Sequence, residues 1–455
     1  MQPLTAQQIA DLLGVTVAAG RTDALAFGGV ATDTRTLPQG AVFFALRGEN
    51  FDGDAFAGAA FAAGAAVVVV HHWTGGEIPA DGAVIVVVDT LLALQQLAVC
   101  WRKQLNLPVV AITGSNGKTS TKDFTAAVLA RKFQVSATRG NLNNHIGVPL
   151  SVLATTPQHT AAVWEMGMNH PGELAPLCAI TRPKFGIITN IGSAHIEYFG
   201  SRDAIAEEKS TLARALPEDG MLFLPVTCDY HEYLRQRTKA TLIPVGNGRG
   251  LVRAEDLCFE AERTRFTLAI EGEEKAAVIL PVLGRHMVTN ALLAAGAGWK
   301  LGISPHEIAA GLSAAQLTGG RLQRYTWQGI TIIDDTYNAN PESMAAAIET
   351  LADTPVPNGA RRFMVMGRMG ELGTHGPDAH RHVGQLAVQR QLTVVAVGEG
   401  SEGIALGARQ ARHFPVLEDA AKWLASEVKP GDVVLLKGSR SATLERVMNS
   451  AFPRT

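Results

Sequence analysis

Cysteine is scarce in this chain. Its 455 residues include four cysteines, and no two of them are close in sequence: Cys100, Cys178, Cys228 and Cys258. This spacing excludes a Cys-x-x-Cys redox motif and a compact disulfide scaffold, and it is typical of buried, reduced thiols in a cytosolic protein. We therefore expect a cytoplasmic protein whose cysteines are structural.

The chain also lacks a large charge excess and a long apolar run. Its formal net charge is -2, so the total charge gives no sign of a nucleic-acid partner. The longest apolar runs, such as Ala65–Val70, have the length of a strand rather than of a membrane span. At the N-terminus, Thr5 and Gln8 have the spacing of a helix capping box, which predicts a folded helix rather than a targeting signal. We expect no membrane insertion.

What the sequence does contain is an alternation of short strands and helices. Its length suggests about three domains, and this alternation predicts an α/β fold with a mostly parallel central sheet. We expect domains at 1–106, 107–314 and 315–455, with a boundary at Leu107-Pro108 because a residue before proline disfavours continued helix. The expected strands are 41–46, 66–70, 84–88, 109–112, 161–164, 185–189, 221–224, 241–245, 330–334, 363–366, 393–397 and 433–437, with a hairpin over 263–280. The main expected helices are 54–63, 91–105, 118–132, 286–301 and 305–312.

The strongest local signal is a glycine-rich turn between an apolar strand and a helix. Gly114 and Gly117 let the backbone curl so that its N–H groups point at phosphate oxygens, Lys118 can reach the β- and γ-phosphates, and the Thr119 hydroxyl can bind Mg²⁺. The common phosphate-loop pattern has a further glycine where this chain has Ile112. The nucleotide-binding candidates are Gly114, Ser115, Asn116, Gly117, Lys118, Thr119 and Ser120. The loop alone does not separate a ligase from a motor, switch or kinase, and the alternative is a plain βα turn with an exposed lysine.

Two further residues are candidates for the metal. Glu165 ends the expected strand 161–164, where a Mg²⁺-binding acid is needed at the carboxyl edge of a sheet; the alternative is a glutamate in a salt bridge. His195 follows the next strand and could face the same crevice, although alone it would be a loop histidine. Lys209 follows two glutamates in a helical stretch, and by composition it is a surface lysine.

Taken together, these segments resemble the Mur ligase family over nearly the whole chain. The runs that carry the resemblance are Thr32–Arg35, the loop Thr113–Ser120, Gly140–Pro149, Glu165–Asn169, Asn190–Tyr198, Gly284–Ala291, Asp334–Pro341 and Lys437–Arg440. The loop is common to the family. The runs Leu142–Pro149, Asp334–Pro341 and Lys437–Arg440 are similar to the member that adds D-alanyl-D-alanine.

The resemblance implies an ATP-dependent ligase with an acyl-phosphate intermediate. ATP would phosphorylate the terminal carboxylate of a UDP-N-acetylmuramoyl-tripeptide, and the amine of D-alanyl-D-alanine would displace the phosphate. The product would be the UDP-muramoyl-pentapeptide precursor of peptidoglycan, with ADP and phosphate released. The first domain would bind the uridine nucleotide, the P-loop domain would bind ATP, and a Rossmann-like third domain would close over both. The third residue of the tripeptide is open between diaminopimelate and lysine, and nothing suggests more than a monomer.

The resemblance also implies roles for particular residues. Lys118 would neutralise the phosphates, Thr119 and Glu165 would bind Mg²⁺, His195 would help bind a second Mg²⁺, and Lys209 matches a lysine that is carbamoylated in many relatives. The other implied site residues are Asn143 and Asn144 in the active-site segment; Asn290, Arg321 and Asp335 at the nucleotide; Tyr337, Asn338 and Asn340 at the incoming amine; and Asp33, Thr34, Arg35, Arg47 and Gly48 at the uridine end.

Two departures from the family pattern bear on this interpretation. Arg368 stands where the family typically has aspartate, so a metal or polar role at that position is in doubt. The chain also lacks the Asp-Asn-Pro-Arg run that selects diaminopimelate in the preceding ligase, which argues against that sibling.

Other functions predict different sites. The run Gly398–Gly403, with Glu418 about 20 residues on, has the pattern of a dinucleotide fingerprint and would indicate an NAD-dependent oxidoreductase, but Glu399 and Glu402 would repel a pyrophosphate. A non-catalytic P-loop ATP switch differs from a ligase because it needs no amine to release phosphate. Zinc could be suggested by the three histidines His375, His380 and His382, for which we expect an exposed polar loop instead.

Overall fold

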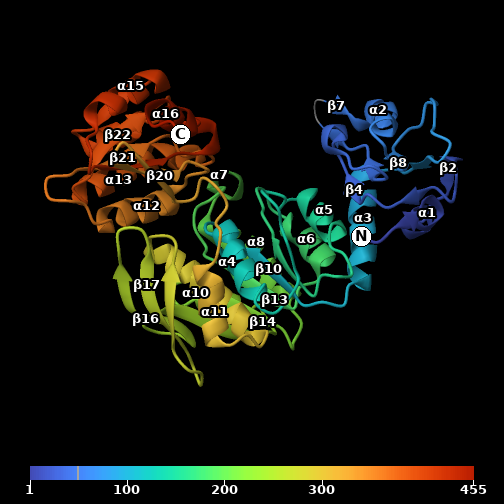
Figure 1. Ribbon diagram of the computed structural model, residues 1–455, viewed down its shortest axis with the longest axis horizontal. Coiled ribbons are helices and arrows are strands. Elements are labelled where there is room, and N and C mark those ends of the chain that lie inside the picture. Colours follow the sequence, from blue (N-terminus) through green and yellow to red (C-terminus); the bar gives the residue numbers. More distant parts are fainter. Residues whose placement is uncertain (49–50, 455) are drawn as a thin grey trace. The chain divides into compact units, whose positions relative to one another are not determined.

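The computed structural model describes residues 1–48 and 51–454 (Figure 1). The chain forms two compact units. The first comprises Met1–Ala111, Phe133–Met168 and Gly172–Lys184, and the second comprises Ile112–Lys132, Asn169–Pro171 and Phe185–Thr455. The chain first passes from one unit to the other within the buried strand β10 (Val109–Thr113).

The N-terminal part of the first unit is a five-stranded sheet with helices. The strand order is β2-β9-β8-β5-β4, in which only β2 is antiparallel to its neighbour. Phe43, Phe61 and Val68 belong to its apolar core. The elements are β1 (Leu4–Thr5), α1 (Ala6–Leu13), β2 (Val17–Gly20), β3 (Leu25–Ala26), β4 (Val30–Ala31), η1 (Thr34–Thr36), β5 (Val42–Phe44), β6 (Arg47–Gly48), β7 (Phe51–Asp52), η2 (Gly53–Phe56), α2 (Ala57–Ala62), β8 (Val67–Val70), β9 (Ala83–Val86) and α3 (Thr90–Gln104). The Thr5 and Gln8 capping box is present, as expected.

The rest of the first unit packs against α3. The indole N–H of Trp101 donates a hydrogen bond to the Thr155 carbonyl at 2.8 Å, beyond the end of α5. Strands β11 and β12 are parallel, and the Ala162 N–H donates to the Pro108 carbonyl at the entry to β10. The elements here are β11 (Val135–Ala137), α5 (Gly147–Leu153), β12 (Ala161–Glu165) and α6 (Leu174–Thr181).

The second unit begins with the helix after β10 and a sheet that is parallel at first and antiparallel at its end. Strands β13 to β18 pair in sequence order, and β16, β17 and β18 form the antiparallel part. Helices α4 and α10 approach closely, because a side chain at Gly298 would lie 2.4 Å from Val128. The elements are α4 (Lys118–Leu129), β13 (Phe185–Ile188), α7 (Ile196–Phe199), α8 (Arg202–Ala215), β14 (Met221–Pro225), α9 (His231–Arg235), β15 (Thr241–Asn247), β16 (Val252–Phe259), β17 (Thr264–Ile270), β18 (Ala276–Leu280), α10 (Arg285–Lys300) and α11 (Pro305–Ser313).

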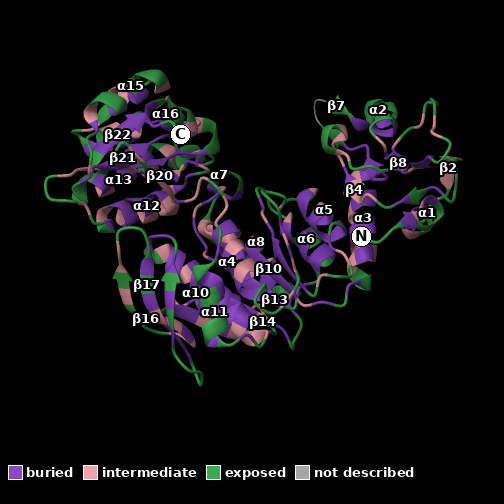
Figure 2. Cartoon of the chain, viewed as in Figure 1, coloured by how far each residue is buried: buried purple, intermediate pink, exposed green. Residues whose placement is uncertain are grey.

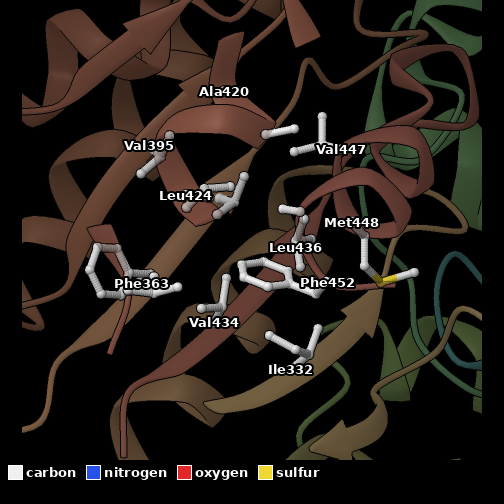
Figure 3. Close-up of a cluster of buried hydrophobic side chains, with 14 of the residues drawn as sticks. Ile332, Phe363, Val395, Ala420, Leu424, Val434, Leu436, Val447, Met448 and Phe452 are labelled. Carbon is white, nitrogen blue, oxygen red and sulfur yellow. The ribbon is translucent and has the colours of Figure 1, made fainter. Parts of the chain in front are cut away.

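The C-terminal part of the second unit is a six-stranded sheet of order β19-β20-β24-β21-β22-β23, in which only β19 is antiparallel. Its four inner strands are mostly buried, whereas the edge strands β19 and β23 are partly exposed, as are the outer faces of its helices (Figure 2). Phe363, Val434, Leu436 and Phe452 pack together in its core (Figure 3). The elements are β19 (Gln323–Trp327), β20 (Ile330–Asp335), α12 (Pro341–Asp353), β21 (Arg362–Met366), η3 (Gly373–His375), α13 (Gly376–Gln389), β22 (Thr393–Val397), α14 (Glu402–Ala408), β23 (Arg412–Phe414), α15 (Leu417–Glu427), β24 (Val433–Lys437), η4 (Arg440–Ala442) and α16 (Leu444–Ala451).

The twelve expected strands are all present, and the expected hairpin turns at Gly272 between β17 and β18. The expectations for the histidines and for the cysteines are wrong in part. His380 and His382 lie in helix α13 rather than in an exposed loop, and the buried His380 ring accepts a hydrogen bond from the Met369 N–H. Cys258 is exposed, because it lies on β16, where burial alternates along the strand; all four cysteines are free. Within the described part of the chain, none of the helices combines the length and apolar character needed to cross a bilayer.

The C-terminal core generates a stability prediction. Phe452 is 0% exposed and its ring lies edge-on to Trp327 at 5.5 Å between centroids. Phe452→Ala should lower the free energy of unfolding by about 3–5 kcal/mol because it removes buried apolar area and leaves a cavity. Urea unfolding followed by tryptophan fluorescence measures this, and Leu406→Ala, at a side chain that is 68% exposed, is the matched control with a change of about 0.5 kcal/mol or less. Equal losses in the two variants would contradict the assigned core.

Candidate active site

The turn between β10 and α4 is held tightly by its surroundings. Gly114 has φ 147° and Gly117 has φ 78°. A Cβ on Gly114 would lie 1.9 Å from the Thr189 hydroxyl oxygen, and one on Gly117 would lie 2.7 Å from the Asn290 side-chain oxygen. Both positions therefore require glycine for the backbone angle and for space. The expected loop is present, and Asn290 packs directly against it.

A second loop, 189–193, supports this turn through four hydrogen bonds. The Ser115 N–H donates to the Asn190 carbonyl at 3.1 Å, and the Asn116 N–H donates to the Asn190 side-chain oxygen at 2.8 Å. The Thr189 hydroxyl donates to the Asn116 carbonyl, and the Gly192 N–H donates to the Ser115 hydroxyl at 2.8 Å. Sequence reasoning missed Thr189 and Asn190 as supports, although Asn190 opens one of the quoted family runs.

The start of α4 presents positive potential. The first intrahelical hydrogen bond runs from the Thr121 N–H to the Gly117 carbonyl, so the N–H groups before it are directed out of the helix end, where they favour an anion. The Lys118 amine donates to the Gly114 carbonyl at 2.8 Å, which places its charge over the turn. Thr119 is buried in the first turn. These features fit the tail of a nucleoside triphosphate.

Lys209 is buried in α8, contrary to the surface position that its composition indicated. Its relative exposure is 1%. Burial, followed by repulsion from Lys118, lowers the pKa of the Lys209 amine well below its ordinary value, and Glu208 opposes this only in part. Burial at this depth disfavours the charged ammonium form of Lys209.

His195 follows the supporting loop and carries a left-handed backbone, with φ 65°. Its Nδ1 lies 2.6 Å from the Glu371 carboxylate. The contact with His195 lowers the pKa of the Glu371 carboxyl group. Glu371 lies in the C-terminal part of the chain, and sequence reasoning assigned it no role.

Glu165 and Asn143 form a pair within the first unit. Glu165 ends β12 as expected and is 1% exposed. Its Oε1 accepts a hydrogen bond from the Asn143 amide at 2.7 Å, whereas its Oε2 has no hydrogen-bond partner among the described residues. A buried carboxylate oxygen without a donor fits a cation ligand. The side-chain oxygen of the neighbouring Asn144 accepts hydrogen bonds from the N–H groups of Ile146 and Gly147 at the start of α5.

A charged pair marks the carboxyl end of the C-terminal sheet. Asp335 and Lys437 are register partners on β20 and β24, with 2.7 Å between carboxylate and amine. Burial raises the pKa of Asp335, opposed by Lys437 and Arg321. Arg321 lies 4.2 Å over the Tyr337 ring, and Lys437 also donates to the carbonyl of Asn338. Sequence reasoning quoted Lys437 in a family run but missed this pairing.

The proposed uridine residues lie where parallel strands of the N-terminal sheet end. Asp33 follows β4 and Arg47 follows β5, and these strands are parallel neighbours. Arg35 binds the Asp33 carboxylate with two nitrogens and holds the pKa of Asp33 at about 2. Arg47 pairs with Asp52 and Asp54. Thr34 lies in η1 and Gly48 in β6.

The competing sites receive no support. In the turn of the dinucleotide pattern, the Gly400 N–H donates to the side chain of Glu402, and the Ser401 hydroxyl donates to the Gly398 carbonyl. The acidic side chain of Glu402 therefore occupies an N–H group that a pyrophosphate would need. Arg368 donates to the Ser441 hydroxyl at 3.2 Å. Among the residues that the structure describes, no cluster of three histidine, cysteine, aspartate or glutamate side chains has the arrangement of a metal site.

Comparisons with known proteins cover most of the chain. The model of the Mur ligase middle domain matches residues 112–298, that of the Mur ligase glutamate ligase domain matches residues 320–440, and that of the Mur ligase family catalytic domain matches residues 27–101. The UDP-N-acetylmuramoyl-tripeptide–D-alanyl-D-alanine ligase of Bacillus subtilis (strain 168) is 38% identical over 453 residues, which are 98% of this chain and 97% of that protein.

The chain belongs to the Mur ligase family.

Solved structures of the family share the fold of this Mur ligase. The crystal structure I of MurF from Acinetobacter baumannii has a TM-score of 0.90 and 34% identity, with 100% of each chain covered. The MurF ligase from Thermotoga maritima, solved in complex with ADP, has a TM-score of 0.82 and 28% identity, with 93% of this chain and 96% of that chain covered. The expected three-domain α/β architecture is confirmed.

Proposed function

We propose that this Mur ligase joins D-alanyl-D-alanine to UDP-N-acetylmuramoyl-tripeptide at the expense of ATP, giving the UDP-muramoyl-pentapeptide precursor of peptidoglycan, ADP and phosphate. The observation that carries the proposal is the glycine loop at 114–117. Thr189 and Asn290 occupy the space that side chains at Gly114 and Gly117 would need. Over almost its full length, the chain resembles UDP-N-acetylmuramoyl-tripeptide–D-alanyl-D-alanine ligases.

The chemistry needs concentrated positive charge. The γ-phosphoryl group of ATP moves to the terminal carboxylate of the tripeptide, the amine of the dipeptide attacks the resulting acyl phosphate, and the tetrahedral intermediate collapses to the amide with loss of phosphate. A carboxylate and a triphosphate repel each other in this step. Lys118 and the N-terminus of α4 offset that repulsion and stabilise charge on the transferred group.

Mg²⁺ fits the donor groups of this chain. Thr119 and Glu165 would bind one Mg²⁺, and His195 would help bind a second, with Lys209 as a further ligand once it is carbamoylated. Glu165 offers the buried oxygen without a donor, and His195 has a second ring nitrogen besides the one at Glu371. Bound Mg²⁺ supplies neutralisation of the phosphate oxygens. Lys209 would contribute as a carbamate, which forms from the neutral amine that burial favours.

The remaining residues would select and orient the substrates. Asn290, Arg321 and Asp335 would contact the nucleotide, and Tyr337, Asn338 and Asn340 the incoming amine. Asn143 would orient Glu165, which it already contacts, with Asn144 holding the same segment through its α5 contacts. Asp33, Thr34, Arg35, Arg47 and Gly48 would bind the uridine end. We place the three functional domains at 1–106, 107–314 and 315–455.

A phosphate-release assay tests the function directly. The UDP-muramoyl-tripeptide is kept constant, and the amine is D-alanyl-D-alanine, D-alanine or no amine. We expect phosphate release with the dipeptide and little with the other two. Release that needs no amine would support a P-loop switch, and preference for the single amino acid would support a different ligase of the family. Repeating the assay with diaminopimelate or lysine as third residue resolves that open choice.

Lys209 generates a prediction about its modification. Because burial lowers the pKa of its amine, this lysine should react with CO₂ at neutral pH to form a carbamate. Carbon-13 NMR of protein equilibrated with labelled bicarbonate should show a carbamate resonance that Lys209→Arg removes. An active wild-type enzyme without that resonance would refute the carbamate.

The glycine loop generates a prediction about nucleotide affinity. Gly114→Ala should weaken binding of a fluorescent ATP analogue by roughly 100-fold, since a Cβ there meets the Thr189 hydroxyl and strain and overpacking each cost about 1–3 kcal/mol. Gly272→Ala is the control, because Gly272 also has positive φ, at 80°, but no atom within 4 Å of the added carbon. The two variants should differ in affinity by fluorescence titration, and equal affinities would contradict the role of the loop.

A further inference from the structure

The carboxylate of Glu342 is bound by a single residue of a distant segment. Glu342 is the second residue of α12. Its Oε1 accepts the Ser193 N–H at 2.8 Å and its Oε2 accepts the Ser193 hydroxyl at 2.9 Å, across 149 residues of chain. Hydrogen bonds to an ionised acceptor are stronger than neutral ones, and a two-point contact also fixes direction.

The backbone around Ser193 is shaped to admit this carboxylate. A Cβ on Gly192 would lie 3.0 Å from the Glu342 carboxyl carbon, so glycine permits the close approach. Next to it, the Ile191 carbonyl accepts a hydrogen bond from Arg202 at 2.8 Å. The supporting loop 189–193 is thus held by Arg202 and by Glu342.

The same loop carries the contacts that shape the phosphate loop. The Gly192 N–H reaches the Ser115 hydroxyl, and Asn190 accepts the N–H groups of Ser115 and Asn116. The first turn of α12 also contacts the phosphate loop directly, because the Asn340 amide donates to the Asn116 side chain at 2.7 Å while its oxygen caps α12. Asn340 and Glu342 therefore connect the start of α12 to both loops.

We propose that Glu342 is a positioning residue that couples docking of α12 to the shape of the ATP site. When α12 is docked, Glu342 fixes Ser193 and Gly192, and these hold Ser115 and Asn116 in the arrangement that receives the phosphates. The negative charge of Glu342 lies at a helix N-terminus, where the helix dipole stabilises it, and both its oxygens face donors rather than the phosphates. This inference rests on the proposed function and adds a positioning residue to the same site.

Steady-state kinetics with ATP as the varied substrate tests the coupling. Glu342→Ala should raise KM for ATP about tenfold, the effect expected of lost hydrogen bonds to a charged group, and should leave KM for the UDP-linked substrate unchanged. Glu342→Gln keeps one acceptor oxygen and should fall between wild type and Glu342→Ala. The matched control is Glu349→Ala on the same helix, which removes a carboxylate that pairs with Arg390 at 2.8 Å and should leave both KM values unchanged.

A double-mutant cycle with Ser193→Ala separates positioning from a general structural effect. In the Ser193→Ala background, Glu342→Ala should raise KM for ATP by a smaller factor than in wild type, because one of the two bonds is already missing. Additive effects, or a wild-type KM for ATP in Glu342→Ala, would overturn the inference. Thermal unfolding of each variant shows whether it is folded. If Glu342→Ala is not folded, the KM for ATP of Glu342→Gln tests the inference instead. Wild-type enzyme without acceptor-dependent turnover would instead overturn the proposed function.

Discussion

The site depends on one constraint, which is the close packing of two loop glycines against side chains from other segments. Gly114 and Gly117 bring the backbone against Thr189 and Asn290, with no room for a methyl group. This contact fixes the curl of the turn after β10 and hence the direction of the N–H groups at the start of α4. Thr189 directly follows β13, and Asn290 lies in α10, so these two elements position the side chains that contact the turn.

The candidate active site is assembled by segments that approach this turn from far along the chain. Loop 189–193 supports it, and α12 contacts both through Asn340 and Glu342. Burial and the charge of Lys118 both lower the pKa of the Lys209 amine. Such an arrangement suits a ligase, because the nucleotide is to be used only when the other substrates are in place. Contacts between the start of α12 and the phosphate loop provide a physical route for that dependence.

The sequence predicted what is local and missed what is long-range. The strand, glycines and lysine of the phosphate loop lie within ten residues, so their periodicity and turn chemistry indicate the structure directly. The pairs Ser193–Glu342 and Asp335–Lys437 join residues 149 and 102 positions apart, and no local pattern carries that information. The sequence predicts a loop at His380 because Pro377 lies between the histidines, whereas proline in the first turn is compatible with starting a helix. Lys209 looked exposed because its neighbours are charged; only the packing of α8 shows that this face is buried.

A crystal structure with a non-hydrolysable ATP analogue tests the central claim most directly. We predict that the phosphates bind the backbone N–H groups of Gly117, Lys118 and Thr119, with the Lys118 amine turned from the Gly114 carbonyl to the phosphates. A nucleotide bound elsewhere, for example at the turn 398–403, with the glycine loop unchanged, would contradict it.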